Sequence, residues 1–221
     1  MTKQNKIILI IAIALIAIGF VLMARNNKAP SGGGTPTAAV RPIDQTDHVW
    51  GDPKAPVQMI VYSDFECPFC AEFAATMKKI QAAFPGKIAI AFRHYPLPIH
   101  AQAEKAAQAG ECAAEQGRFW EMHDKLFADN VAGKMSPEQF KQDAADLGLD
   151  QNKFNQCLDS GQYAEKVSQE KAEGEKAGVT GTPTSFMNGN IYPGAHPFED
   201  FTAPDGRSEL GMKSIISGLL K

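Results

Sequence analysis

The sequence is poor in cysteine and has no excess of positive charge. Its 221 residues contain 4 Cys, and 25 Asp and Glu slightly outnumber 22 Lys and Arg. So few cysteines exclude a disulfide-dense miniprotein, and the charge balance argues against binding nucleic acid through a basic face. Phosphate-binding loops and Ser–His–Asp patterns are also missing. The fractions of hydrophobic (44%) and charged (21%) residues are ordinary, which excludes a wholly disordered chain and a collagen-like fibre.

One long hydrophobic run stands near the start of the chain. Residues 7–24 contain no charged side chain, and as a helix they would be roughly 27 Å long, close to the hydrocarbon thickness of a bilayer. Lys3 and Lys6 would suit a signal peptide, but the run is long for one and no clear cleavage site follows Met23. We therefore expect residues 1–24 to be an uncleaved transmembrane anchor, with a cleaved signal segment as the alternative.

The rest of the chain divides into a linker and a domain. Residues 25–47 are rich in Gly, Pro, Ser and Thr and show no apolar periodicity, which predicts a flexible linker. The folded domain is expected at 48–221. It opens with a strand at 55–64, a helix at 71–84 and a strand at 87–95, which together form a βαβ unit.

The middle of the domain, about residues 98–178, carries helical signals and no strand signal. Ser136 and Asp150 stand where helix N-caps are expected. The elements expected after this region are strands at 184–188 and 191–192, a hairpin turn at Asn188–Asn190, and an amphipathic helix at 208–220. This order predicts an α/β fold with a helical subdomain inserted into a sheet domain.

Cys67 and Cys70 form a C-x-x-C pair directly after the first predicted strand, where the next helix opens. Half of a zinc site is the alternative interpretation, but a zinc ribbon needs a second pair at similar spacing. A helix N-terminus favours a thiolate because its unpaired N–H groups and its dipole act on the sulfur, and Pro68 suits the first turn. The placement predicts a redox site with Cys67 as an exposed nucleophile and Cys70 as a shielded resolving thiol.

A second feature, Thr182-Pro183, leads into a later strand. Proline at this point can simply mark a strand boundary. In a redox domain it can instead follow a cis peptide bond, whose turn presents the backbone of Thr182 to an extended substrate. We favour the second interpretation because of the C-x-x-C pair upstream.

These features together resemble the DsbA family of thiol–disulfide oxidoreductases, which have a thioredoxin-like fold with an inserted helical subdomain. The resemblance is carried by residues 65–70 (Phe-Glu-Cys-Pro-Phe-Cys), by the helical insertion and by residues 181–184 (Gly-Thr-Pro-Thr). It covers residues 47–221, which is nearly the whole of the chain after the hydrophobic run and the linker.

The resemblance implies a cis Thr182–Pro183 bond beside the dithiol. It also implies a peptide-binding groove between the two subdomains, with Pro68, Phe69, Thr182 and Pro183 as substrate-contacting residues, and a mixed disulfide between Cys67 and substrate. Strongly oxidising members carry His between the cysteines, where this chain has Phe69. The sequence therefore leaves oxidant, isomerase and reductase open.

The remaining cysteines, Cys112 and Cys157, both lie on predicted helices of the insertion. They could be two buried thiols, a second redox-active pair, or a structural disulfide. We favour the disulfide for a domain outside the cytoplasm. It would close a loop of about 46 residues, worth roughly 4 kcal/mol in the chain-entropy model.

Other side chains near the dithiol are expected to have structural roles. The five histidines do not form a ligand set, so we expect no metal and no cofactor. Asp64 and Glu66 are expected to be solvated loop charges rather than groups that tune the thiols. Phe65, Phe69 and Phe73 either form an apolar rim for unfolded chains or pack the domain.

The predicted function is a thiol–disulfide oxidoreductase that introduces or reshuffles disulfides in reduced or misfolded exported proteins. A membrane partner such as a quinone-linked oxidase would re-oxidise the dithiol. This chemistry predicts a single-pass protein of the bacterial cytoplasmic membrane with its domain on the periplasmic side. The alternative is a thioredoxin-fold chaperone or a copper metallochaperone that uses Cys67 and Cys70, although the Met or His expected for a Cu(I) site is missing nearby.

Overall fold

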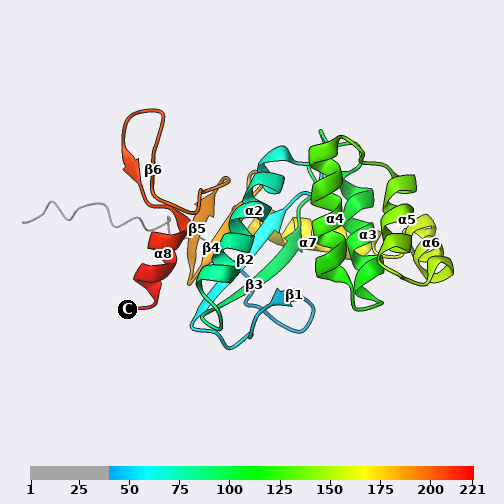
Figure 1. Cartoon of the computed structure of the whole chain (residues 1–221), viewed down its shortest axis with the longest axis horizontal. Coiled ribbons are helices and arrows are strands. Elements are labelled where there is room, and N and C mark those ends of the chain that lie inside the picture. The colour runs from blue at the N-terminus through cyan, green and yellow to red at the C-terminus, as the bar shows by residue number, and fades with distance from the viewer. Residues whose placement is uncertain (1–39) are drawn as a thin grey trace, which may run out of the picture. The chain divides into compact units, whose positions relative to one another are not determined.

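The computed structural model describes residues 40–221, and a five-stranded sheet lies at the centre of this part of the chain (Figure 1). Its strand order is β1-β3-β2-β4-β5. The strands are β1 (His48–Trp50), β2 (Val57–Ser63), β3 (Ile88–His94), β4 (Thr184–Met187) and β5 (Asn190–Pro193). β2 and β3 are parallel and are joined through α2 (Pro68–Ala83), so the predicted βαβ unit is present.

The other strand pairs are antiparallel. β1 pairs with β3, β4 pairs with β2, and β5 pairs with β4. The turn between β4 and β5 contains Asn188 (φ 47°) and Gly189 (φ 82°). Asn-Gly tolerates two successive positive φ angles, which is why this pair predicts the hairpin correctly.

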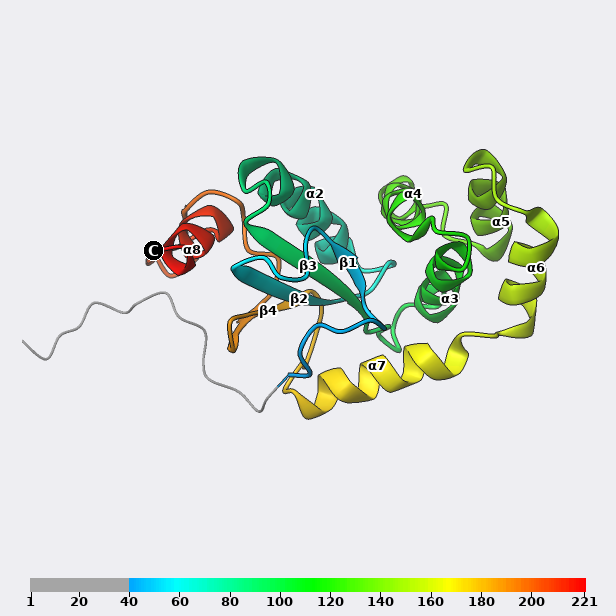
Figure 2. The same ribbon diagram turned by 90° about the horizontal axis from the view of Figure 1, so that it is seen from below.

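Both faces of the sheet are covered by helices. In β2 the side chains of Met59 and Val61 belong to the core on one face, while Ile60 and Tyr62 belong to a second core on the other. α2 and α8 (Met212–Leu219) cover the first face, and α7 (Ala164–Lys176) covers the second (Figure 2).

The helical insertion extends from one end of the sheet. It consists of α3 (Ala103–Ala114), α4 (Phe119–Ala132), α5 (Pro137–Asp146) and α6 (Gln151–Ser160), after which α7 returns to the sheet. Both predicted N-caps are confirmed, since Ser136 accepts from the N–H of Gln139 and Asp150 from that of Lys153. The core on the α2 face continues into these helices without a break.

A buried ionic cluster joins the insertion to the sheet. Glu111 of α3 is 2% exposed, and its Oε1 lies 2.7 Å from His48 Nε2 and 2.8 Å from His94 Nε2. Its Oε2 accepts from Lys166 of α7 at 2.6 Å. Burial alone would raise the pKa of Glu111, but the two histidines outweigh it and hold that pKa well below its usual range. Three chain segments thus meet on one carboxylate.

The short strands of the structure are not predicted from the sequence. β1 was not expected, nor was the separate two-stranded sheet formed by β6 (Phe201–Thr202) and β7 (Ser208–Glu209). The C-terminal helix, expected from residue 208, begins at Met212 because Ser208 and Glu209 pair with β6. Strands of two or three residues are too short to show a two-residue period.

The end of the predicted linker also differs from expectation, because residues 40–47 lie on the domain. Arg93 is fully buried and donates to both carboxylate oxygens of Asp47, at 2.8 and 3.0 Å, and to Pro42 O at 3.1 Å. Arg41 donates to Asp47 as well. A buried guanidinium needs a carboxylate partner, and Asp47 supplies it, so this segment is fixed rather than flexible.

The predicted membrane anchor (residues 1–24) and the remaining linker lie outside the described residues. Within residues 40–221, none of the helices has the length and apolar character needed to cross a bilayer.

Candidate active site

Cys67 and Cys70 stand at the start of α2 as free thiols. Cys67 is the N-cap residue and Pro68 the first helical residue, as the sequence predicts. The carbonyl of Cys67 accepts from the N–H of Cys70 at 3.1 Å and from that of Ala71 at 3.2 Å. This first turn brings the two sulfurs to the same end of the helix.

The expected exposure of Cys67 is wrong. Cys67 is 3% exposed and Cys70 is 1% exposed, whereas Phe69 between them is 62% exposed. The loop at Thr182 reaches Cys67, because Cys67 Sγ donates to Thr182 O at 3.6 Å. The Cys67 thiol is therefore covered both by α2 and by a loop that lies 115 residues further along the chain.

The Thr182–Pro183 peptide bond is cis. Two hydrogen bonds fix its loop: Gly194 N–H donates to Pro183 O at 2.8 Å, and the Thr184 hydroxyl donates to Gly181 O at 2.7 Å. The four residues predicted to contact substrate thus fall into two groups on either side of Cys67. Pro68 and Phe69 are exposed on α2, and Thr182 and Pro183 are on the facing loop.

The two thiols have opposite acidities. A hydrogen bond from Cys70 lowers the pKa of Cys67 to about 6. Burial opposes this effect, whereas the backbone N–H groups of Cys70 and Phe69 and the side chain of Thr182 support it. Burial raises the pKa of Cys70 far above its usual range, and the nearby Cys67 thiolate adds to the rise. Near neutral pH one sulfur is therefore a thiolate and its neighbour a thiol that donates to it.

Asp64 is not the solvated loop charge that was expected. It is 2% exposed, and its carboxylate accepts from Glu66 N–H at 2.8 Å and from Leu97 N–H at 2.8 Å. Its Oδ2 also lies 2.7 Å from His100 Nδ1. Glu66 is half-buried, and its carboxylate accepts from Gln102 N–H at 2.5 Å. Both side chains attach the cysteine turn to the segment that leads into α3.

The three phenylalanines near the dithiol have different positions. Phe65 and Phe73 are each 1% exposed, and Phe65 stacks on Phe92 with ring centroids 5.0 Å apart. Asn130, at the end of α4, donates to Phe65 O at 2.7 Å, a contact that no sequence signal indicates. Only Phe69 of the three is an exposed apolar side chain.

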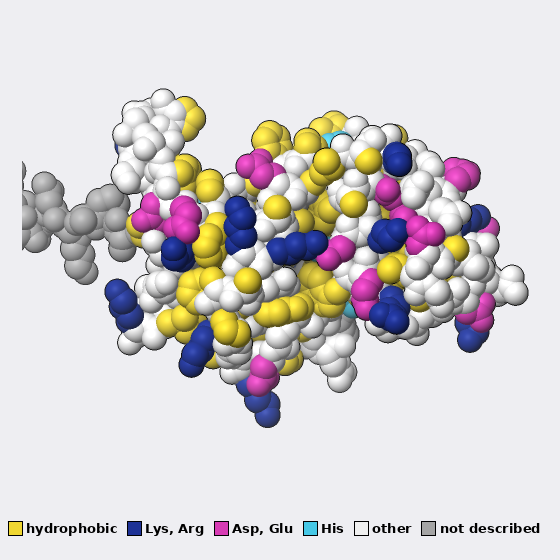
Figure 3. Space-filling view, viewed as in Figure 1, with side chains coloured by type: hydrophobic (Ala, Val, Ile, Leu, Met, Phe, Trp, Pro, Cys, Tyr) yellow, Lys and Arg dark blue, Asp and Glu magenta, His cyan; other side chains and the backbone are white. Residues whose placement is uncertain are grey.

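Phe69 has two exposed apolar counterparts on the segments that contact this turn. Ile99 is 81% exposed and precedes His100, while Val131 is 79% exposed and follows Asn130. Figure 3 shows hydrophobic side chains at the edge of the molecule where α2 begins and α4 ends. Apolar surface therefore borders the dithiol on the side of the helical insertion.

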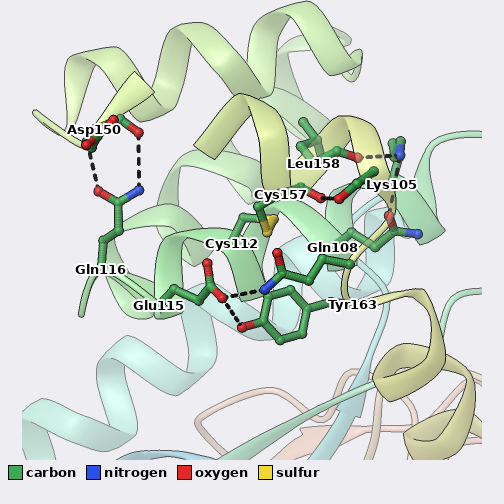
Figure 4. The surroundings of a disulfide bond; sticks show 11 residues. Lys105, Gln108, Cys112, Glu115, Gln116, Asp150, Cys157, Leu158 and Tyr163 are labelled. Carbon is green, nitrogen blue, oxygen red and sulfur yellow. Dashed lines mark hydrogen bonds between the residues drawn. A yellow bond between two sulfur atoms is a disulfide. The ribbon is translucent and has the colours of Figure 1, made fainter. Parts of the chain in front are cut away.

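Cys112 and Cys157 form a disulfide that joins α3 to α6 (Figure 4), with their Cα atoms 5.9 Å apart. Both residues are buried. Hydrogen bonds border the bond, among them one from the Tyr163 hydroxyl to Glu115 at 2.7 Å. Among residues 40–221, no group of three or more His, Cys, Asp or Glu side chains is arranged to hold a metal ion.

A dithiol with unequal acidities at a helix N-terminus, facing a cis proline on a mixed sheet, has the geometry that thiol–disulfide exchange requires. The chain belongs to the thioredoxin family, because the family model described as thioredoxin matches residues 44–204.

Solved structures agree with the predicted DsbA-like architecture. Oxidised BdbD from Bacillus subtilis has a TM-score of 0.68 and 22% identity, over 84% of this chain and 99% of that one. Wolbachia pipientis α-DsbA1 has a TM-score of 0.63 and 25% identity, over 80% of this chain and 92% of that one. The resemblance inferred from the sequence is confirmed for the thioredoxin-like domain with its helical insertion.

The curated relatives carry a different name. A Salinispora tropica protein named Na(+)/H(+) antiporter NhaA 3 is 34% identical over 190 residues, covering 77% of this chain but 29% of its own length. A Salinispora arenicola antiporter, NhaA 1, is 36% identical over 164 residues, covering 73% and 25%. The chain spans less than a third of these relatives, so the transport named for them is not assigned to it.

Proposed function

We propose that this protein introduces or reshuffles disulfide bonds in exported proteins, with Cys67 as the nucleophile and Cys70 as the resolving thiol. The observation that carries the proposal is the placement of the dithiol at the start of α2, with Cys67 Sγ 3.6 Å from the carbonyl oxygen of Thr182 in the cis-proline loop. The pKa of Cys67, lowered to about 6, and the raised pKa of Cys70 support it. A thiolate at Cys67 attacks disulfides and leaves readily, because the sulfur of lower pKa is the better leaving group.

The oxidising reaction proceeds in two exchanges. A substrate thiolate attacks Cys67 of the Cys67–Cys70 disulfide, which breaks that bond and leaves the electron pair on Cys70. A second substrate thiolate then attacks the substrate sulfur of the mixed disulfide and releases the Cys67 thiolate. In the isomerising direction, reduced Cys67 attacks a substrate disulfide first.

A polypeptide substrate fits the surroundings of the dithiol. The exposed side chains of Phe69, Ile99 and Val131 offer apolar contacts to an unfolded chain. The backbone of Thr182, whose carbonyl oxygen lies 3.6 Å from Cys67 Sγ, is positioned to hydrogen-bond an extended segment that brings its cysteine to the site.

The proposed location is the outer side of the bacterial cytoplasmic membrane, with residues 7–24 as the anchor. The Cys112–Cys157 disulfide supports a compartment where disulfides persist. Steady oxidation there needs an electron acceptor, for which we propose a quinone-linked membrane oxidase. A Cys67 pKa of about 6 lies between those of thioredoxin (about 7) and DsbA (about 3.5).

Oxidative refolding tests the proposal. The oxidised, metal-free protein is expected to restore activity to a reduced, unfolded enzyme, and Cys67→Ser is expected to abolish this effect. Parallel reactions with a scrambled, fully oxidised substrate measure isomerase activity, and equilibration in glutathione buffers measures the potential. If Cys67→Ser refolds the substrate as fast as the wild type, the proposed nucleophile is wrong.

A further inference from the structure

The turn before α2 directs a backbone donor at the buried thiol. Asp64 directly follows β2, and its N–H donates to Cys70 Sγ at 3.4 Å. Cys70 is 1% exposed, so water does not solvate charge on this sulfur. A fixed N–H group at that distance replaces part of the missing solvation.

The carboxylate of Asp64 holds the turn in this position. Asp64 Oδ1 accepts from the N–H of Glu66, and Oδ2 accepts from the N–H of Leu97 and from His100 Nδ1, over 2.7–2.8 Å. A carboxylate only accepts, so the imidazole nitrogen carries the hydrogen. The first donor closes the turn itself, and the other two lie on the segment after β3. Asp64 thus joins the turn before α2 to the segment after β3, while its own N–H faces Cys70.

We propose that Asp64 is a positioning residue for Cys70. Its carboxylate fixes the turn so that the Asp64 N–H points at Cys70 Sγ when that sulfur carries negative charge. The proposal rests on the proposed function, because it concerns the same dithiol. It assigns the Asp64 carboxylate to the step in which Cys70 reacts and gives that carboxylate no part in the attack by Cys67, whose N–H donates to the backbone carbonyl of Asp64 at 3.1 Å.

That step can be isolated with oxidised glutathione. The Cys67 thiolate attacks one glutathione sulfur, forms a mixed disulfide and expels glutathione thiolate. Cys70 then gives up its proton, which the expelled glutathione thiolate takes up, and the Cys70 thiolate attacks Cys67 Sγ. The Cys67–Cys70 bond forms, the mixed disulfide breaks, and a second glutathione thiolate leaves with the electron pair. Two thiols are oxidised while one glutathione disulfide is reduced to two thiols.

The test compares the lifetime of the glutathione adduct in wild type and Asp64→Asn. Reduced protein is mixed with oxidised glutathione, quenched with acid at intervals and weighed by mass spectrometry. The amide places a donor where the carboxylate accepted, so we expect the turn to shift and the adduct to persist about tenfold longer, as for a lost hydrogen bond to a charged group. The rate at which the adduct forms is expected to stay within about twofold of wild type.

Two further variants complete the experiment. Glu66→Gln is the matched control, because Glu66 lies on the same turn and its carboxylate accepts from the N–H of Gln102 rather than acting on either sulfur. Its adduct lifetime should equal that of wild type. His100→Asn, at a half-buried position, removes one of the three hydrogen-bond donors to the Asp64 carboxylate. A smaller increase in the lifetime of the glutathione adduct is expected, and this variant tests the proposal even if Asp64→Asn fails to fold.

The outcomes separate the two proposals. Wild-type lifetimes in Asp64→Asn and His100→Asn would overturn the role of Asp64 and leave the proposed function intact. The same holds if adduct formation and resolution slow equally, which indicates a merely structural role. If the wild-type protein forms no adduct at Cys67, both proposals are overturned.

Discussion

Replacing Cys70 with alanine is expected to raise the pKa of Cys67, although Cys70 itself is not the attacking thiol. The hydrogen bond from Cys70 is the largest of the effects that place the pKa of Cys67 at about 6. A hydrogen bond to a charged group is worth about 1.5–3 kcal/mol, which corresponds to roughly 1–2 pH units. The pKa of Cys67 in Cys70→Ala should therefore be about 7–8.

The consequence for reactivity is greatest near pH 6. There about half of the wild-type Cys67 is thiolate, whereas in Cys70→Ala roughly 1–10% is. The rate of alkylation by iodoacetamide should fall by about 5–50-fold at this pH and approach the wild-type rate above pH 9. Mass spectrometry of the peptide that contains Cys67 distinguishes its alkylation from that of Cys70 in the wild type.

Cys70→Ser provides the matched control for this measurement. Its hydroxyl can still donate, so its profile should stay closer to wild type than that of Cys70→Ala. An unchanged pKa of Cys67 in Cys70→Ala would refute the reasoning, because the neighbouring thiol would then not be the main stabiliser of the thiolate.

Three further predictions concern stability. Burial, together with the neighbouring carboxylate of Asp143, raises the pKa of Asp129 on α4 to about 7. The folded protein therefore retains a proton that the unfolded chain loses near pH 4, and stability should fall between about pH 4 and 7. Asp129→Asn should flatten that fall and stabilise the protein at pH 8 by on the order of 2 kcal/mol in urea unfolding. Removing the disulfide in a Cys112→Ser/Cys157→Ser variant should lower the free energy of unfolding by up to roughly 4 kcal/mol, and an unchanged melting temperature would exclude a structural role. Glu111→Ala should cost about 3–5 kcal/mol in the same assay, because Lys166 and two histidines lose their buried partner; a loss under about 1 kcal/mol would mean that the cluster contributes little.

Local signals account for what the sequence predicted correctly. The C-x-x-C pair, Pro68 and the strand before them define a helix start within a few residues. The same holds for the N-cap at Ser136 and for the Asn188-Gly189 turn. In each case the residues that determine the backbone are neighbours in the chain, so their pattern is readable without tertiary structure.

Long-range contacts account for what the sequence could not show. Cys67 is buried by a loop 115 residues away, and Asp64 by Leu97 and His100, which follow the next strand. Asp47 was assigned to a flexible linker because its partner, the buried Arg93, is 46 residues distant. Charges in turns are usually solvated, and only the tertiary structure identifies those that are held by several donors.

The acidity of Cys67 clarifies the meaning of the Pro68-Phe69 dipeptide. Phe69 is 62% exposed and its side chain brings neither charge nor a hydrogen-bond donor, which from the sequence left oxidant, isomerase and reductase open. Yet the pKa of Cys67 is lowered through the thiol of Cys70 and through backbone N–H groups, including that of Phe69 itself. These donors come from the start of the helix and do not depend on the dipeptide side chains. A reactive thiolate at Cys67 therefore follows from the Cys70 thiol and from the N–H groups at the start of α2, and does not require a polar side chain at Phe69.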